Sequence, residues 1–225
     1  MSLILAIETS SVCGSVALVT KGEIIGSQQY HLDRSHSSVL HPMIKDLMAE
    51  KGYDFSELKA IALSKGPGSY TGLRIGASAA KGLCYALDIP LIGINTLESM
   101  VFQLTKIRPG YDLYCAMLDA RRMEVYALLM DAQMETVQET EPVILHESSY
   151  ADQLESKNIL FFGEGSGKFK EIMDHPNAHF VDEATPSAED VAMMAQNEFD
   201  EGNFENVISF EPFYLKEYRI IPPKK

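Results

Sequence analysis

The chain has 225 residues, 46% of them hydrophobic, and its 19 Lys and Arg residues stand against 32 Asp and Glu residues, for a net charge of −13. This length and apolar content predict one large or two small globular domains. The negative charge argues against independent binding of RNA or DNA, because phosphate contacts require clustered cations. Any nucleic acid would have to be held through a partner.

Cys13, Cys84 and Cys115 are odd in number, far apart in the chain and surrounded by apolar residues. They predict buried, reduced thiols in a cytoplasmic protein. The apolar run at residues 3–7 is too short for a signal peptide and ends directly in Glu8. Residues 73–94 are interrupted by charges and a proline, so we expect neither secretion nor a membrane span.

The first half of the chain alternates strand and helix patterns. Strands are expected at residues 3–7, 15–20 and 24–31, followed by a helix that Ser37 or Ser38 caps and that runs to about residue 51. A strand at 60–64, a helix at about 71–87 and a strand at 91–94 come next. Thr96 is expected to cap a helix that reaches about residue 106.

After Pro109-Gly110 the same pattern begins again. Strands are expected at 113–118, 125–130, 134–145 and 159–162, with helices near 148–155, after Lys168 and at about 187–201. The order of three strands, helix, strand and helix therefore occurs twice, and the first strand of each copy ends in a carboxylate, Glu8 or Asp119. This repeat predicts a duplicated α/β protein with an N-terminal half, 1–108, and a C-terminal half, 109–225, that ends in a basic tail.

A glycine-rich segment, residues 66–76 (GPGSYTGLRIG), joins a predicted strand to a predicted helix. Glycines permit close approach of other groups, and a helix N-terminus favours an anion. However, Gly66, Gly68 and Gly72 match neither the P-loop nor the dinucleotide fingerprint, so close packing against a neighbour is the alternative interpretation. Residues 163–168 (GEGSGK) also lack phosphate-loop spacing and are interpreted as a turn that begins a helix.

Five segments together resemble the TsaB (YeaZ) family: residues 4–10 (ILAIETS), 36–44 (HSSVLHPMI), 66–76, 163–165 (GEG) and 212–216 (PFYLK). The resemblance covers nearly the whole chain and implies the actin/Hsp70/sugar-kinase-like (ribonuclease H-like) fold, with two βββαβα-type halves. It also implies a role in making threonylcarbamoyladenosine beside the anticodon of tRNAs that read codons beginning with A.

The same resemblance implies an accessory role with no catalytic residues in this chain. The protein is expected to form a heterodimer with TsaD, the related metal-bearing transferase, and to activate it. TsaE, a P-loop ATPase, is expected to join the larger complex. Binding of tRNA is expected only through the complex, and a homodimer is expected when the protein is alone.

No metal site is expected. TsaD relies on a His-x-x-x-His pair, whereas His36 and His41 are five residues apart here, which places them about 140° apart around a helix. Glu8 and Asp119 stand where ATPases of the superfamily place carboxylates near phosphate and magnesium, although the family usually has Asp at the position of Glu8. The other residues of this possible nucleotide or phosphate vicinity are Ser10, Ser69, Tyr70, Thr71 and Arg74.

We expect no tightly bound cofactor, with ATP or ADP and magnesium possible only at the partner interface. Two other functions stay open: an ATPase or kinase of the same fold, and a metallopeptidase-like protein. Each carboxylate has a structural alternative, namely a solvated strand end or a structural hydrogen-bond acceptor.

Two helices are the predicted docking surface for TsaD or for a second copy. The first carries an apolar stripe and the second a face of small residues: Val39, Leu40, Met43, Ile44 and Leu47, then Gly72, Leu73, Gly76 and Ala80. The alternative is that the protein's own sheet covers both stripes. Arg74 opposes the helix dipole, so it is expected to pair with a carboxylate or a ligand, and Phe213 and Tyr214 are expected to pack on the body of the protein.

Overall fold

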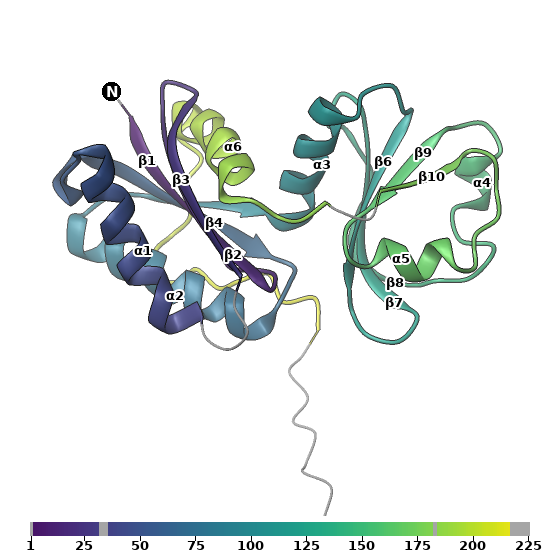
Figure 1. Ribbon diagram of the computed structural model, residues 1–225, viewed down its shortest axis with the longest axis horizontal. Coiled ribbons are helices and arrows are strands. Elements are labelled where there is room, and N and C mark those ends of the chain that lie inside the picture. The colour runs from purple at the N-terminus through teal and green to yellow at the C-terminus, as the bar shows by residue number, and fades with distance from the viewer. Residues whose placement is uncertain (1, 32–35, 182–183, 217–225) are drawn as a thin grey trace, which may run out of the picture.

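The computed structural model describes residues 2–31, 36–181 and 184–216, which form two five-stranded sheets that lie side by side (Figure 1). The first sheet has the order β3-β2-β1-β4-β5. Its strands are β1 (Leu3–Glu8), β2 (Cys13–Thr20), β3 (Glu23–His31), β4 (Leu58–Gly66) and β5 (Leu91–Asn95). The three first strands are antiparallel neighbours, whereas β1, β4 and β5 run parallel.

The second sheet repeats this arrangement with the order β8-β7-β6-β9-β10 and the same strand directions. Its strands are β6 (Leu113–Asp119), β7 (Glu124–Asp131), β8 (Thr136–Ile144), β9 (Ile159–Phe162) and β10 (Ala178–Val181). The predicted duplication is therefore confirmed. β10 was not predicted, because four half-buried residues at a sheet edge are too few to show a periodic pattern.

The continuous apolar run of β1 is covered on both faces, as predicted. Leu5 and Ile7 lie in a core with α1 (His36–Lys51) and α2 (Tyr70–Leu87). Ile4 and Ala6 point to the other face, where three alanines of α6 (Ala188–Glu201) let that helix pack closely on the sheet. The alternation of side chains along the strand thus divides one apolar run between two cores.

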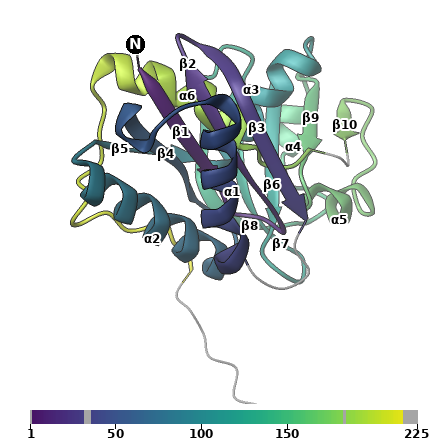
Figure 2. The ribbon, with the colours of Figure 1, turned by 60° about the vertical axis from the view of Figure 1, so that its left-hand side comes forward.

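The helices α3 (Thr96–Ile107) and α6 are exchanged between the two halves (Figures 1 and 2). The apolar face of α3 lies in the core of the second sheet, with Leu97, Met100, Val101 and Leu104. Conversely, α6 follows the second sheet in sequence but packs on the first. The expected division into 1–108 and 109–225 stays a prediction; the structure shows only which sheet each of these two helices covers.

The second sheet has short helices on its other face. α4 (Ala151–Leu154) is shorter than expected, and α5 (Ser166–Lys170) follows the glycine turn at 163–165. Phe169 of α5 meets the Phe161 ring at a centroid distance of 5.0 Å, and Tyr150 completes an aromatic cluster with both. A 3-10 turn, η1 (Phe55–Glu57), precedes β4.

After α6, residues 203–216 return along the first sheet and then reach the second. The Glu205 N–H donates to the Leu91 carbonyl at 2.8 Å, and the Phe213 N–H donates to the Lys65 carbonyl at 2.6 Å. The Tyr214 ring packs on Tyr70 at 5.0 Å as predicted, although Phe213 and Tyr214 stay 39% and 37% exposed. The basic tail from residue 217 onward lies outside the described residues.

Asn95, rather than Thr96, caps α3 and also connects the two halves. Its Oδ1 accepts from the Leu97 N–H at 2.8 Å, and its Nδ2 donates to Thr140 Oγ1 of β8 at 2.9 Å. We expect Asn95→Ala to lower the free energy of unfolding by about 1–2 kcal/mol, measured by urea denaturation. Asn95→Asp keeps the cap acceptor and loses only the amide donor, and the Thr140 hydroxyl can donate to the carboxylate instead, so this variant should lose less; equal losses would contradict the capping role.

Candidate functional site

The glycine-rich segment packs against the turn that follows β1. A Cβ added at Gly72 would lie 1.9 Å from the Thr9 carbonyl oxygen, and one at Gly76 would lie 2.3 Å from Thr9 Oγ1. At Gly68 the added atom would lie 2.5 Å from the Ser10 carbonyl oxygen. Three of the glycines are therefore required by close packing inside this chain, which is the alternative interpretation of the motif.

Hydrogen bonds hold this contact in place. The Ser69 N–H donates to the Ser10 carbonyl at 2.7 Å, and Thr9 Oγ1 donates to the Gly72 carbonyl at 2.9 Å. Ser69 also caps α2, because its Oγ accepts from the Gly72 N–H at 3.3 Å. The polar atoms at the start of α2 are thus hydrogen-bonded within the chain, to the turn at Thr9 and Ser10 that follows β1.

Glu8 is fully buried where β1 ends. Its Oε1 accepts from the Ser10 N–H at 2.5 Å, and its Oε2 accepts from the Ser64 hydroxyl of β4. Burial raises the pKa of Glu8, and the hydrogen bonds from Ser10 and Ser64 oppose that shift. Glu8 was interpreted either as part of a phosphate and magnesium site or as a structural hydrogen-bond acceptor. The structure shows the acceptor, because both carboxylate oxygens accept hydrogen bonds inside the protein.

Asp119, the counterpart of Glu8 in the second half, has an exposed carboxylate. Its Oδ1 accepts from the Arg121 N–H at 2.5 Å and lies 3.2 Å from Lys168 Nζ, at the start of α5. Glu164 lies close by, and its pKa is raised by burial and by the charge of Asp119. Glu8 and Asp119 thus occupy equivalent positions in the two sheets but differ in environment. The turn at 163–165 begins α5, as expected.

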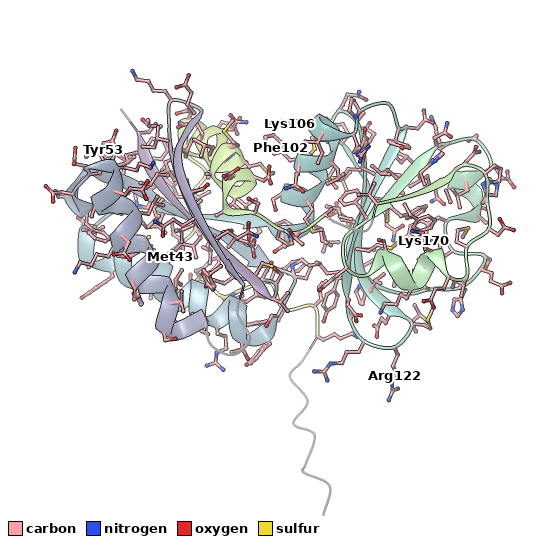
Figure 3. The ribbon with its side chains drawn as sticks, in the orientation of Figure 1. Met43, Tyr53, Phe102, Lys106, Arg122 and Lys170 are labelled. Carbon is pink, nitrogen blue, oxygen red and sulfur yellow. The ribbon has the colours of Figure 1, made fainter. Side chains whose placement is uncertain are left out.

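The apolar residues of the predicted docking surface lie in the core of the first half. Leu40, Ile44 and Leu47 of α1 are at most 1% exposed, and Met43, labelled in Figure 3, is 7% exposed. Gly72, Leu73, Gly76 and Ala80 of α2 are also buried, and Val39 is only partly exposed. The protein's own sheet thus covers both stripes, so any docking on these helices must use their other sides.

The outer sides of α1 and α2 border a hollow of about 440 Å³. It is lined by His41 of α1 and, from α2, by Tyr70, Thr71, Arg74, Ile75, Ser78 and Ala79. Sequence reasoning placed Tyr70, Thr71 and Arg74 near a possible ligand but missed His41, Ile75 and Ser78. The helical spacing of Thr71, Arg74 and Ser78 was the signal that could have grouped them on one face.

A carboxylate or a ligand was expected beside Arg74; among the residues that the structure describes it contacts an aromatic ring, and the ligand stays a prediction. Arg74 Nη1 donates to the Tyr70 hydroxyl at 3.2 Å, and the guanidinium carbon lies 5.5 Å from the centre of the Tyr70 ring. Because Tyr214 also packs on this ring, the three side chains form one unit beside the hollow. The structure therefore joins the C-terminal segment to the start of α2.

The three cysteines are buried and none of them forms a disulfide, as predicted. Burial raises the pKa of the Cys84 thiol to about 11 and that of Cys115 to about 12, so both are protonated at neutral pH. Within the described ranges no group of three His, Cys, Asp or Glu side chains converges as metal ligands would. The His36 side chain lies outside the described part, so the predicted absence of a metal stays a prediction.

The repeated sheet order, with a carboxylate at the end of each first strand, defines a duplicated α/β protein of the actin/Hsp70/sugar-kinase-like class. The fold is shared with the activator of 2-hydroxyisocaproyl-CoA dehydratase from Clostridium difficile, a structure with bound ADPNP. That comparison has a TM-score of 0.51 at 11% identity and covers 89% of this chain and 96% of that chain. At this identity the comparison concerns the fold alone.

Closer relatives define the family. The family model of TsaD, tRNA N6-adenosine threonylcarbamoyltransferase, matches residues 23–220. The tRNA threonylcarbamoyladenosine biosynthesis protein TsaB of Escherichia coli is 32% identical over 223 residues, covering 95% of this chain and 94% of that protein. A structure from Pseudomonas aeruginosa, described as similar to peptidase YeaZ, has a TM-score of 0.82 at 30% identity and covers 96% of this chain and 100% of that one. The chain belongs to the TsaB (YeaZ) family.

In the residues for which positions are described, no helix combines the length and apolar character needed to cross a membrane.

Proposed function

We propose that this protein takes part in threonylcarbamoyladenosine biosynthesis as a non-catalytic subunit. It binds TsaD as a heterodimer and activates it for threonylcarbamoyl transfer to the adenosine beside the anticodon of tRNAs that read codons beginning with A. TsaE joins the larger complex, and the chain forms a homodimer when TsaD is absent. The observation that carries this proposal is the family relationship, which extends over almost the whole chain.

The state of Glu8 supports a non-catalytic role. A magnesium ligand must be accessible to the ion and its water shell, whereas Glu8 is fully buried and both of its oxygens accept hydrogen bonds inside the protein. The glycine segment is likewise closed against Thr9 and Ser10. These contacts disfavour the alternative of an independent ATPase or kinase and support our proposal that ATP and magnesium act only at the joint interface.

The outer sides of α1 and α2 are the surface that we propose for TsaD. The hollow between these helices combines an aromatic ring, a guanidinium group and small side chains. Tyr85 extends the same side of α2 and is 86% exposed. Exposed aromatic and arginine side chains are typical anchors of protein interfaces.

Titration of ATP and magnesium into the isolated chain and into its mixture with TsaD tests the proposal. We expect heat of binding only from the mixture, which should elute as a heterodimer in size-exclusion chromatography. Modification of tRNA should require both proteins. Magnesium-dependent ATP turnover by the isolated chain, lost in Asp119→Ala, would instead establish the ATPase function.

Ser78→Glu places a charge on the exposed floor of the hollow without entering the core of the protein. We expect this variant to fold normally and to weaken binding to TsaD at least about tenfold, because burying an unpaired charge costs more than 1.4 kcal/mol. Isothermal titration measures the affinity. Ser156→Glu is the matched control, since Ser156 is an exposed serine beside α4 in the other half; equal affinities for the two variants would place the surface elsewhere.

A further inference from the structure

The hairpin between β6 and β7 presents two adjacent arginines at its tip. Arg121 and Arg122 are exposed and have left-handed backbone conformations, with φ of 72° and 54°. Such a conformation costs a non-glycine residue about 1 kcal/mol or more, so two consecutive arginines are a costly choice for a turn. In Figure 3 the Arg122 side chain points away from the second sheet into solvent.

The tip is held rigidly by the residues around it. The Arg121 N–H donates to Asp119 Oδ1, and Lys168 Nζ donates to the carbonyls of Arg122 and Glu124, each at 2.7 Å. The Ala120 N–H closes the hairpin on the Glu124 carbonyl at 3.0 Å. A bound group would therefore meet two guanidinium groups on a backbone that is already fixed.

Both carboxylates of this hairpin are neutralised by lysines from other segments. Asp119 pairs with Lys168, and Glu124 pairs with Lys216 of the C-terminal segment at 2.5 Å. Glu164, the third carboxylate nearby, is exposed and lies close to Asp119, on the turn before α5 rather than on the hairpin. Neither arginine has an ion-pair partner within the described ranges, so the tip carries uncompensated positive charge on a chain with a net charge of −13.

We propose that Arg121 and Arg122 contact phosphate groups of an RNA backbone when the protein is in its complex with TsaD. Guanidinium groups bind phosphate oxygens through two parallel hydrogen bonds, and such contacts position a nucleic acid without reading its sequence. The chain as a whole is acidic, so the substrate tRNA of the proposed complex would approach it at a cationic site such as this tip. The inference rests on the proposed function for the identity of the RNA.

The test compares the wild-type complex with one that carries Arg121→Gln and Arg122→Gln. Glutamine keeps a similar backbone preference, so folding should be preserved while two charges are lost. Fluorescence anisotropy with a transcribed tRNA, at 50 to 200 mM salt, should show weaker binding in the variant. Each lost phosphate contact lowers the slope of log K against log salt by about 0.7 to 0.9, so the double variant should lose about 1.4 to 1.8.

Two further variants serve as controls. Arg108→Gln with Lys157→Gln removes the same charge at exposed positions elsewhere and should leave the slope unchanged. Arg121→Lys with Arg122→Lys should restore most of the slope, since lysine also neutralises phosphate. An unchanged slope in the glutamine variant would overturn the inference, and so would loss of TsaD binding, which would assign the tip to the protein partner.

The isolated chain separates this inference from the proposed function. At 20 mM salt, addition of tRNA should shift the NMR amide signals of the hairpin tip in the wild-type chain and not in the glutamine variant. Absence of these shifts together with an unchanged slope would remove the inference and leave the function standing. Shifts at the tip in a chain that does not bind TsaD would show that the arginines contact RNA, but they would count against the proposed function and would overturn the inference as stated for the complex.

Discussion

Gly72→Ala is expected to lower the free energy of unfolding by at least about 3 kcal/mol, a large share of the stability of an ordinary domain. The new Cβ would lie 1.9 Å from the Thr9 carbonyl oxygen. Relief would require α2 to move away from β1, which would break the bonds from Ser69 to Ser10 and from Thr9 to Gly72. Overpacking of this kind costs about 1–3 kcal/mol even where side chains can adjust, and here the obstacle is backbone.

Gly82→Ala is the matched control on the same helix. Gly82 is exposed, and an added Cβ there has no atom within 4 Å. Alanine favours the helix over glycine by about 1 kcal/mol, so this variant should be slightly more stable than the wild type. Urea denaturation of both variants decides the matter; a Gly72→Ala protein of wild-type stability would contradict the role assigned to the glycine segment.

Glu8→Ala is expected to lower the free energy of unfolding by about 2–4 kcal/mol. It would leave the buried Ser10 N–H and the Ser64 hydroxyl without their acceptor and create a cavity at the end of β1. Glu8→Gln keeps an oxygen for the Ser10 N–H and a polar group beside Ser64. The glutamine variant should therefore be at least as stable as the wild type at neutral pH, because it also removes the buried charge.

The stabilities of the wild type and of Glu8→Gln are expected to depend differently on pH. The pKa of Glu8 is higher in the folded protein than its ordinary value of 4.5, so the folded state binds more protons between the two values. The wild type consequently loses stability as the pH rises through the raised folded value, whereas Glu8→Gln lacks this loss. We expect the stability difference to grow in favour of the glutamine variant from pH 4.5 to 7; a constant difference would show that the pKa is not raised.

Much of the candidate site could be located from the sequence, although the contacts of its residues could not. The glycine segment, Glu8 and Asp119 were recognised from their positions at strand ends, and the structure places them there. That both Glu8 oxygens are engaged depends on Ser64, which is 56 residues away in sequence and reaches Glu8 only because β4 lies beside β1. The hollow also needs His41, which no local pattern connects with α2.

The sequence by itself determined the order of most elements, the duplication and the apolar sides of α1 and α2, because these depend on residues that are neighbours along the chain. Only the tertiary structure decided what covers each apolar side. Leu47 of α1 faces its own sheet rather than a partner, α3 covers the second sheet and α6 the first. The physical reason is that the hydrophobic effect is non-directional: a periodic pattern shows that a face must leave water but does not identify the surface that it meets.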